Sequence, residues 1–268
     1  MVDRSMPVAL TIAGSDSGGG AGIQADLKTF EAFGVWGTSA VTGVTAQNTV
    51  GVHDSLVLPP GLVRSQIDAV VSDIGVAAAK TGMLGNAAVI LAVAEAVSEH
   101  SIGTLVVDPV LVTSHGELLL ETTAVKVLVE ELLPLCTLVT PNIPEAEALV
   151  GHPVEGPAGM AEAAEELHAL GAGAVLVKGG HLESDESPDV FFDGTFLQWL
   201  EGPRIPGRHT HGTGCTLSAA VCAGLATGVV LFEACVRGKA FVAGAIEGGV
   251  DIGSGVGPVN PGWRHSRR

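Results

Sequence analysis

Short apolar runs alternate with longer segments of helical period along most of this 268-residue chain, and this alternation limits the possible folds more than any other feature. Parallel strands need a long crossover, usually a helix, between one strand and the next. The alternation therefore predicts an α/β fold with a mainly parallel central sheet. The predicted buried strands are Val8–Ala13, Ala77–Thr81, Thr104–Asp108, Leu138–Thr140 and Ala174–Lys178.

Helical patterns fill the intervals between these strands, and a polar turn at Asp193-Gly194 predicts a hairpin late in the chain. No linker, repeat or break in composition divides the sequence. We therefore expect residues 1–268 to form a single domain, with residues from about 263 to 268 as a frayed tail. The predicted helices are Gly22–Phe33, Leu62–Ser72, Ala87–His100, Ala124–Leu133, Glu145–Val150, Ala158–Leu170, Cys215–Ala226 and Leu231–Glu247.

The chain is strongly acidic, with 13 Lys and Arg against 29 Asp and Glu and a net charge of −16. The charge is carried by an apolar body, since 47% of residues are hydrophobic and only 16% are charged. Such a surface repels nucleic acid and anionic membranes, so we expect neither as a partner.

The lack of a recognisable targeting signal and the spacing of the cysteines both predict the same compartment. The start lacks the pattern of a signal peptide, no apolar stretch reaches the length of a membrane span, and the four cysteines show no CxxC spacing. We expect a cytoplasmic protein with reduced thiols. The scattered histidines do not have the spacing of a zinc site.

Glycine and polar residues collect where the predicted strands end. In open α/β sheets, ligands bind outside the carboxyl ends of the strands. We therefore expect a site assembled from several of these loops. The loops are Gly14–Gly22, Thr81–Leu84, Asp108–Val110, Thr140–Asn142 and Lys178–His181.

The segment from His209 to Ala220 contains Gly212-Thr213-Gly214-Cys215 just before a predicted helix. Free N–H groups and the positive end of the helix dipole would suit a phosphoryl group there. The same dipole predicts a lowered pKa for the Cys215 thiol, which could then accept a proton from an alcohol. On the other interpretation, the glycines only turn the chain and Cys215 is a small buried hydrophobe.

Carboxylates and a lysine stand at three other strand ends, each with two interpretations. Asn142 and Glu145 fit a capping box, although Glu145 could also hold a hydrated Mg²⁺ beside phosphates. Asp108 is a turn former or a second carboxylate near that metal. Lys178 is a solvated strand end or an ammonium that faces phosphate.

The first glycine loop does not match a known nucleotide fingerprint. Its glycines at 18, 20 and 22 do not fit GxGxxG, and no GxxxxGK[ST] occurs in the chain. Asp26 and Gln47 could bond a polar heterocycle, and Met83 and Val110 could pack on its faces. Taken singly, a surface or core role is favoured for each, with Asp26 by default solvated; Gln47 is the stronger candidate, because its amide offers both a donor and an acceptor.

Taken together and in order, seven segments resemble the bacterial hydroxymethylpyrimidine/phosphomethylpyrimidine kinases of thiamine biosynthesis, a branch of the ribokinase-like superfamily. The resemblance runs from about Pro7 to Val259. The segments are Thr11–Thr29, Val44–Thr49, Lys80–Leu84, Val107–Val110, Thr140–Ala146, Lys178–His181 and Thr210–Ala220.

The resemblance implies a ribokinase-like three-layer α/β/α sandwich and an enzyme that uses ATP and Mg²⁺. It would phosphorylate 4-amino-5-hydroxymethyl-2-methylpyrimidine to its monophosphate and then to the diphosphate, usually as a homodimer. Cys215 would be the base, where most of the superfamily has aspartate. The resemblance further assigns Gln47, Asp26, Gly14, Ala21, Met83 and Val110 to the substrate, Gly212, Thr213 and Gly214 to the anion hole, Lys178, Thr210 and Asn142 to the nucleotide, and Asp108 and Glu145 to the metal.

The chain departs from the family pattern at His209, where the family often has Asn or Asp, and at Asn260–Trp263, which replaces the usual histidines. Two alternatives stay open. A pyridoxal or pyridoxine kinase of the same branch is one, although Leu111–Gly116 lacks the lid cysteine that some of those enzymes have. A pyrimidine-binding sensor without catalysis is the other.

Overall fold

The sheet at the centre of the molecule has nine strands in the order β3-β2-β1-β4-β5-β6-β7-β8-β9. The structure, a computed structural model, describes residues 6–111, 122–182 and 185–266. The neighbouring strands β2, β1, β4, β5, β6 and β7 all run parallel. Strand β3 at one edge and strands β8 and β9 at the other pair in the antiparallel sense. Their bounds are β1 Val8–Asp16, β2 Trp36–Gln47, β3 Val52–Val57, β4 Ala78–Thr81, β5 Leu105–Val107, β6 Leu138–Val139, β7 Val175–Val177, β8 Asp189–Phe192 and β9 Leu197–Leu200.

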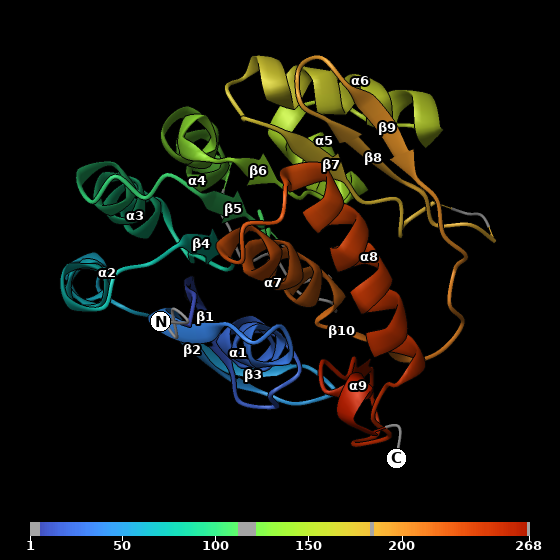
Figure 1. Cartoon of the computed structure of the whole chain (residues 1–268), viewed down its shortest axis with the longest axis horizontal. Helices are drawn as coiled ribbons and strands as arrows, with labels where there is room; N and C mark the ends of the chain where they lie inside the picture. The colour runs from blue at the N-terminus through green and yellow to red at the C-terminus, as the bar shows by residue number, and fades with distance from the viewer. Residues whose placement is uncertain (1–5, 112–121, 183–184, 267–268) are drawn as a thin grey trace, which may run out of the picture.

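Helices cover both faces of this sheet. The prediction of a three-layer α/β/α sandwich with mainly parallel strands is therefore confirmed. Figure 1 shows α2 to α6 in an arc along one side, with α1, α7 and α8 on the other. The first layer holds α2 Pro60–Asp73, α3 Ala87–Glu99, α4 Thr122–Val127, α5 Ile143–Val150 and α6 Gly156–Ala169, with a π turn Leu128–Leu132 and a 3₁₀ turn Leu133–Leu135 after α4. The second holds α1 Gly22–Ala32, α7 Thr213–Ala226 and α8 Leu231–Glu247.

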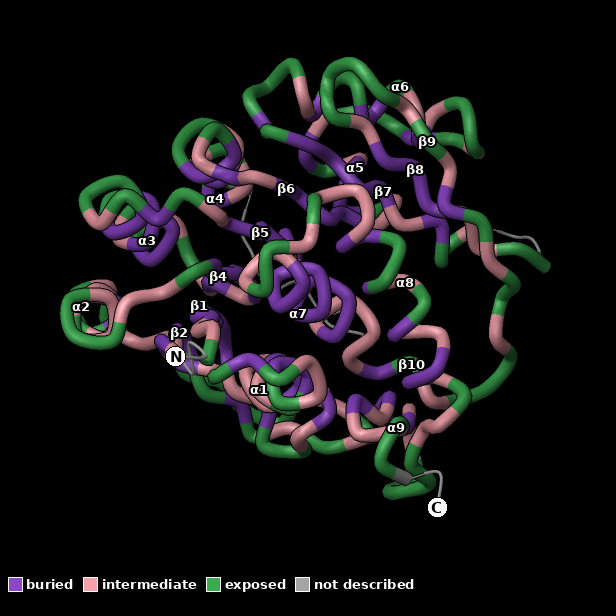
Figure 2. Tube along the Cα trace, in the orientation of Figure 1, coloured by how far each residue is buried: buried purple, intermediate pink, exposed green. Residues whose placement is uncertain are grey.

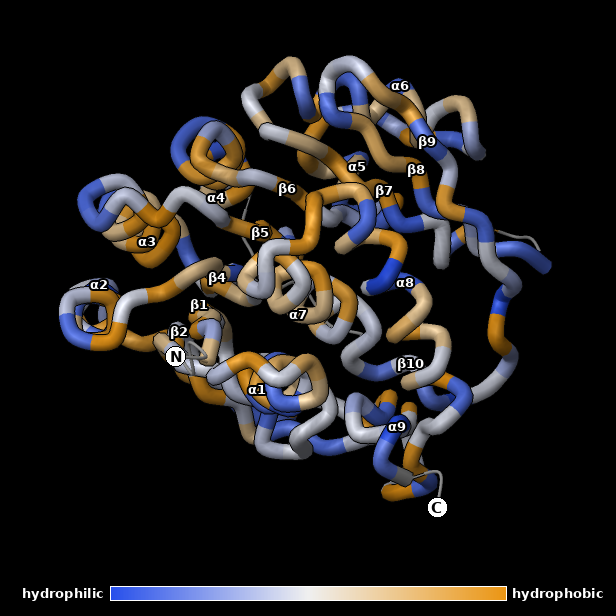
Figure 3. The backbone as a smooth tube through the Cα atoms, in the orientation of Figure 1, coloured by the Kyte–Doolittle hydropathy of each residue, from blue (hydrophilic) through white to orange (hydrophobic). Residues whose placement is uncertain are grey.

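Successive strand residues feed the two layers in turn, because side chains alternate across a sheet. In β5, Leu105 and Val107 join the core cluster under the α2–α6 layer, while Val106 joins the cluster under α1, α7 and α8. All three are fully buried, which explains why β5 is continuously apolar. Figure 2 shows the central strands as buried, and Figure 3 shows their hydrophobic colouring along β5 and β8.

Helix α7 is buried over most of its length, unlike the helices of the outer layer. Every residue from Thr216 to Gly224 is buried, which accords with a helix that is apolar on all sides. The sheet below it and its neighbours α1 and α8 hold its N-terminus in one place.

The end of the chain differs from the frayed tail that we expected. Trp263–Ser266 form a short helix, α9, and the Trp263 ring lies 6.2 Å from that of Phe241. The guanidinium of Arg264 stacks over Phe241 and Phe33 at 5.0 and 5.6 Å. This aromatic packing orders residues whose composition alone predicts mobility; residues 267–268 lie outside the described ranges.

Three pairings were absent from the sequence prediction. Strand β2 pairs with β1 and with the edge strand β3, and a small sheet joins β10 His209–His211 to β11 Gly257–Pro258. The predicted hairpin at Asp193-Gly194 is confirmed as β8 and β9. In the described ranges, no helix has both the length and the apolar character needed to span a membrane.

Candidate active site

A cavity of about 1290 Å³ opens at the carboxyl ends of the parallel strands, where the sequence predicted a site. The loops that follow β1, β4, β5, β6 and β7 all contribute to it, together with the N-terminus of α7. Every proposed site residue except Asp26 lines this cavity. These residues are Gly14, Ala21, Gln47, Met83, Asp108, Val110, Asn142, Glu145, Lys178, Thr210, Gly212, Thr213, Gly214 and Cys215.

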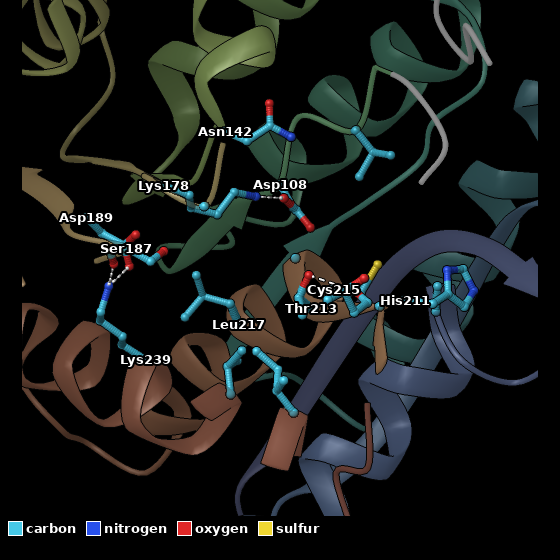
Figure 4. Close-up of a pocket in the computed structure, with 18 of the residues that line it drawn as sticks. Asp108, Asn142, Lys178, Ser187, Asp189, His211, Thr213, Cys215, Leu217 and Lys239 are labelled. Atoms are coloured by element: carbon cyan, nitrogen blue, oxygen red, sulfur yellow. Dashed lines mark hydrogen bonds and ion pairs between the residues drawn. The ribbon is translucent and has the colours of Figure 1, made fainter. Parts of the chain in front are cut away.

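The cavity is elongated, with α7 between its two ends. In Figure 4, His211 and Cys215 stand at one end, Asp189 and Lys239 at the other, and Lys178 with Asp108 between them. Two ligands, one at each end, would therefore approach each other at the start of α7.

Gly212 is the N-cap of α7, and its geometry admits no other residue. Its φ is +84°, and a Cβ there would lie 1.8 Å from the carbonyl oxygen of Gly20. Among the residues that the structure describes, no side chain caps the helix, so the first N–H groups of α7 are available to a ligand. The turn is braced by the Thr213 hydroxyl, which donates to the carbonyl of Thr210 at 3.0 Å.

Cys215 occupies the first turn of α7 and is half-buried, but the predicted lowering of its pKa is wrong. Burial raises the pKa of the Cys215 thiol to about 12, and the charges of Asp26 and Asp108 add to the rise. Lys80 and the backbone N–H of Gly22 oppose this effect without overcoming it. Desolvation of the thiolate is the largest cause of this rise.

Lys178 directly follows β7 and joins two carboxylates from neighbouring strand ends. Its Nζ lies 3.2 Å from Asp108 Oδ1 and 3.7 Å from Glu145 Oε2. Burial by itself lowers the pKa of Lys178, but the two carboxylates outweigh burial and raise it. Ser218 on α7 donates to Asp108 Oδ2 at 3.1 Å. The cluster thus carries a lysine cation and an acidic pair inside the cavity.

Asn142 and Glu145 form the capping box that their spacing predicts. The Asn142 side chain accepts from the Glu145 N–H at 2.9 Å, and Glu145 Oε2 accepts from the Asn142 N–H at 2.8 Å. The same Glu145 oxygen faces Lys178. The capping role and a role in the cavity are therefore compatible.

The acidic pair has the chemistry of a magnesium site. Burial and the neighbouring charge of Asp108 raise the pKa of Glu145, and a divalent cation would relieve that repulsion. Carboxylate oxygens suit Mg²⁺, which binds one or two of them and keeps several waters. Within the described ranges, no group of three or more His, Cys, Asp or Glu side chains could hold a metal. Phosphates and water would have to complete the coordination.

Asp26 lies under the cavity floor and does not line it, and it is not solvated as its position on a helix predicted. It is fully buried and pairs with Lys80 Nζ at 3.1 Å, while Thr11 donates to it at 2.6 Å. Lys80, also fully buried, was missed by the sequence reading. Its signal is a lysine inside the apolar strand Ala77–Thr81.

Two further pairs at opposite ends of the cavity escaped the sequence reading. Asp16 Oδ2 lies 2.9 Å from His211 Nε2, and Gln47 Nε2 is 3.3 Å from the same ring nitrogen. At the far end, Lys239 Nζ lies 2.8 Å from Asp189 Oδ2. The members of each pair are far apart in the sequence, so no local pattern announces them.

Burial alone would raise the pKa of Asp16, but hydrogen bonds from His211, Ala21 and Gly18 outweigh it and lower the pKa. The loop from Ser17 to Ala21 is therefore wrapped around an ionised carboxylate.

Some pyridoxal kinases have a lid cysteine where this chain has Leu111–Gly116. Residues 112–116 of that segment lie outside the described residues.

Comparison with known proteins places these features in a family. A phosphomethylpyrimidine kinase family model matches residues 16–260. The chain is 51% identical over 256 residues to the hydroxymethylpyrimidine/phosphomethylpyrimidine kinase of Rhizobium meliloti, covering 94% of this chain and 96% of that protein. It is also 51% identical over 251 residues to a thiamine biosynthesis bifunctional protein of Geobacter sulfurreducens, covering 94% of this chain but only 51% of that protein.

Among solved structures, the ADP complex of Bacillus subtilis pyridoxal kinase superposes with a TM-score of 0.91 at 40% identity, covering 97% of this chain and 99% of that one. The superposed region spans nearly the whole length of both chains. The ribokinase-like fold, the loops at the strand ends and the matched family together lead to one conclusion. The chain belongs to the phosphomethylpyrimidine kinase family.

Proposed function

We propose that this protein transfers phosphate from ATP to the hydroxymethyl group of 4-amino-5-hydroxymethyl-2-methylpyrimidine, and from a second ATP to the resulting monophosphate, for thiamine diphosphate synthesis. One observation carries the proposal. The uncapped N-terminus of α7 stands inside a single cavity, with a thiol on one side and a lysine–carboxylate cluster on the other. A kinase needs this order of acceptor, phosphoryl cradle and donor.

The pyrimidine is assigned to the end of the cavity near Cys215. Gln47 offers a donor and an acceptor to the aminopyrimidine edge, while Met83 and Val110 pack on the ring. Gly14 and Ala21 leave room for close approach. Asp26 acts from below through Lys80, whose positive charge favours the thiolate form of Cys215.

The amides of Gly212, Thr213 and Gly214 would hold the transferring phosphoryl group. Positioning and electrostatic stabilisation supply most of the rate, because phosphoryl transfer passes through a loose transition state. Cys215 accepts the proton of the hydroxymethyl group as the oxygen attacks phosphorus.

The nucleotide is assigned to the side of Lys178, Thr210 and Asn142, with the Lys178 ammonium toward its phosphates. Asp108 and Glu145 would hold Mg²⁺ through oxygen or water. When bound, the ion neutralises phosphate charge. Local positive charge of this kind is needed, because the chain as a whole carries −16.

ADP production on three acceptors tests the proposed function. Purified protein with ATP and Mg²⁺ should turn over the pyrimidine alcohol and its monophosphate, with less turnover of pyridoxal and little without an acceptor. Turnover of pyridoxal alone would replace this function by that of a pyridoxal kinase. Calorimetric binding of the pyrimidine with no ADP from any acceptor would indicate a sensor.

We propose a homodimer, supported by the exposed edge of the sheet. Val44 and Leu56 face each other across β2 and β3 and are 47% and 67% exposed. An exposed apolar edge of this kind is normally covered by a partner. Light scattering should give about twice the 27.0 kDa of one chain, and Leu56→Lys should shift the mass toward that of a monomer.

We also propose a cytosolic location. Cys136, Cys215, Cys222 and Cys235 are all free thiols, which suits a reducing compartment, and ATP is the proposed donor. Fractionation of the source cell with an antibody to the chain tests this assignment.

A further inference from the structure

The side-chain amide of Gln47 lies between two groups that decide which of its ends is oxygen. Its Nε2 is placed 3.3 Å from His211 Nε2, and its Oε1 is 3.2 Å from Thr45 Oγ1. The two ends of an amide are nearly equal in size, so the surrounding hydrogen bonds determine their assignment.

Asp16 makes the His211 nitrogen a donor. Its Oδ2 accepts from the backbone N–H groups of Gly20 and Ala21 at 3.0 and 2.9 Å and lies 2.9 Å from His211 Nε2. Its Oδ1 accepts from Gly18 at 2.8 Å. These hydrogen bonds lower the pKa of the Asp16 carboxyl, so it is ionised and has no hydrogen to donate. His211 Nε2 therefore carries the hydrogen, whether the ring is neutral or charged, and shares it between Asp16 Oδ2 at 2.9 Å and the Gln47 amide at 3.3 Å.

The Thr45 hydroxyl imposes the complementary requirement. It has one hydrogen, and the carbonyl oxygen of Ser15, which can only accept, lies 2.9 Å away. Thr45 therefore offers Gln47 a lone pair. An amide oxygen beside Thr45 and an amide nitrogen beside His211 would set acceptor against acceptor and donor against donor. Rotating the amide by half a turn removes both conflicts.

We propose that His211, held as a donor by Asp16, is a positioning residue that orients the Gln47 amide with its oxygen toward His211 and its nitrogen toward Thr45. One amide hydrogen and one oxygen lone pair remain for a ligand. The reverse orientation would exchange them and mismatch an aminopyrimidine edge. The orientation follows from the protein's own contacts, whereas its consequence for the pyrimidine rests on the proposed function.

Packing fixes the ring that performs this role. A Cβ at Gly20 would lie 2.6 Å from His211 Cδ2, so the loop backbone rests directly against the imidazole. His211 also precedes Gly212, the N-cap of α7. The same residue thereby joins the pyrimidine end of the cavity to the phosphoryl cradle.

Nitrogen NMR of wild-type protein labelled at histidine and glutamine, without ligand, is the direct test. The His211 signals are identified by their loss in His211→Gln. We expect Nε2 to show a directly bonded hydrogen, and the Gln47 amide hydrogens to show contacts to Thr45. A His211 Nε2 without hydrogen, or Gln47 amide hydrogens close to the His211 ring, would overturn the proposal. This result does not depend on which substrate the enzyme uses.

Calorimetry with 4-amino-5-hydroxymethyl-2-methylpyrimidine tests the consequence. His211→Leu should weaken binding about tenfold, as expected for a lost hydrogen bond that orients a partner, and His211→Gln should recover most of the affinity. In a Gln47→Ala background, His211→Leu should weaken binding less than about threefold, since His211 acts through Gln47. ADP affinity should stay within about twofold throughout, because the proposed function places ADP at the other end of the cavity.

Equal losses in both backgrounds, or a parallel loss of ADP affinity, would show that His211 has only a structural role. If the wild type does not bind the pyrimidine, the proposed function fails, while the NMR measurement still decides the orientation of Gln47.

Discussion

Cys215 shows how strongly the surroundings of one residue decide its chemistry. Its place at the N-terminus of α7 favours the thiolate, but burial raises its pKa to about 12. Lys80 opposes this rise most strongly and forms a buried ion pair with Asp26. The base would therefore be mostly a neutral thiol at pH 7, and its proton affinity suits an alcohol rather than an acceptor that is already ionised.

Replacing Cys215 should separate the two transfers. Cys215→Ala should lower the rate on the pyrimidine alcohol by about 10²–10⁴-fold, the usual contribution of a general base. The monophosphate is already ionised and should lose much less. Single-turnover rates on each acceptor measure both effects. Equal losses on the two acceptors would refute the assignment of Cys215 as the base.

The raised pKa of Cys215 also predicts a pH dependence. Only the deprotonated form can accept a proton, and a pKa of about 12 lies far above neutral pH. The logarithm of kcat/KM on the alcohol should therefore rise with pH, with a slope near 1, between about pH 7 and 9. The monophosphate serves as the control and should give a flatter profile. A flat profile on the alcohol would contradict the thiolate mechanism.

The pair of Lys80 and Asp26 should affect stability as well as catalysis. Lys80→Met leaves the Asp26 carboxyl buried without its partner and should cost about 3–5 kcal/mol in the free energy of unfolding. Adding Asp26→Asn should recover part of this loss. Lys126→Ala is the control, because its pair with Glu130 is exposed and worth less than about 1 kcal/mol. Urea titration measures all three, and a small effect of Lys80→Met would contradict a buried ion pair.

At the scale of elements, the start of α7 is the part of the fold on which the site depends most. The helix is buried between the sheet, α1 and α8, and the loop of Gly20 presses against its N-cap. Amides that bind a phosphoryl group are useful only if they stay in place, because misplacement by about 1 Å can cost ~10²-fold in rate.

Comparing two glycines of the same φ separates the cost of backbone strain from the cost of a steric clash with a Cβ atom. Gly151 and Gly212 both have φ +84°, but a Cβ at Gly151 meets nothing within 4 Å, whereas one at Gly212 would lie 1.8 Å from the Gly20 carbonyl oxygen. Gly151→Ala should cost about 1–2 kcal/mol and leave kcat/KM nearly unchanged. Gly212→Ala should cost more and lower kcat/KM at least ~10²-fold. Similar kinetics for the two variants would contradict the role of this turn.

At the scale of the whole molecule, the net charge of −16 opposes the binding of an anionic nucleotide. Lys178 and Lys239 place positive charge inside the cavity, but both are paired with carboxylates. Under the proposed function, local amides and a divalent cation would therefore add to the Lys178 ammonium in attracting the nucleotide, while the long-range field repels it.

The salt dependence of the two substrates should reflect this division. Raising ionic strength from about 10 to 150 mM shortens the Debye length from roughly 30 to 8 Å and screens the repulsion. We expect kcat/KM for ATP to rise by up to a few-fold, while that for the uncharged pyrimidine alcohol stays constant. Steady-state kinetics at fixed Mg²⁺ measure both. A steep fall for ATP would mean that exposed basic residues attract the nucleotide.

Much of the architecture follows from local patterns in the sequence. The run Leu105–Val107 is apolar throughout because both faces of a parallel sheet are covered, and that pattern is visible without coordinates. The capping box of Asn142 and Glu145 depends on a spacing of three residues and was likewise predictable. The loops at the strand ends identified the edge of the sheet that carries the cavity.

Only the tertiary structure determined which residues far apart in the sequence contact each other, and how far each side chain is removed from solvent. His211 meets Asp16 across 195 positions, and Lys178 meets Asp108 across 70. Such contacts depend on strand order and crossovers, which periodicity does not encode. The pKa of Cys215 and the burial of Asp26 depend on the same packing, because desolvation is a property of everything around a group and not of its neighbours in sequence.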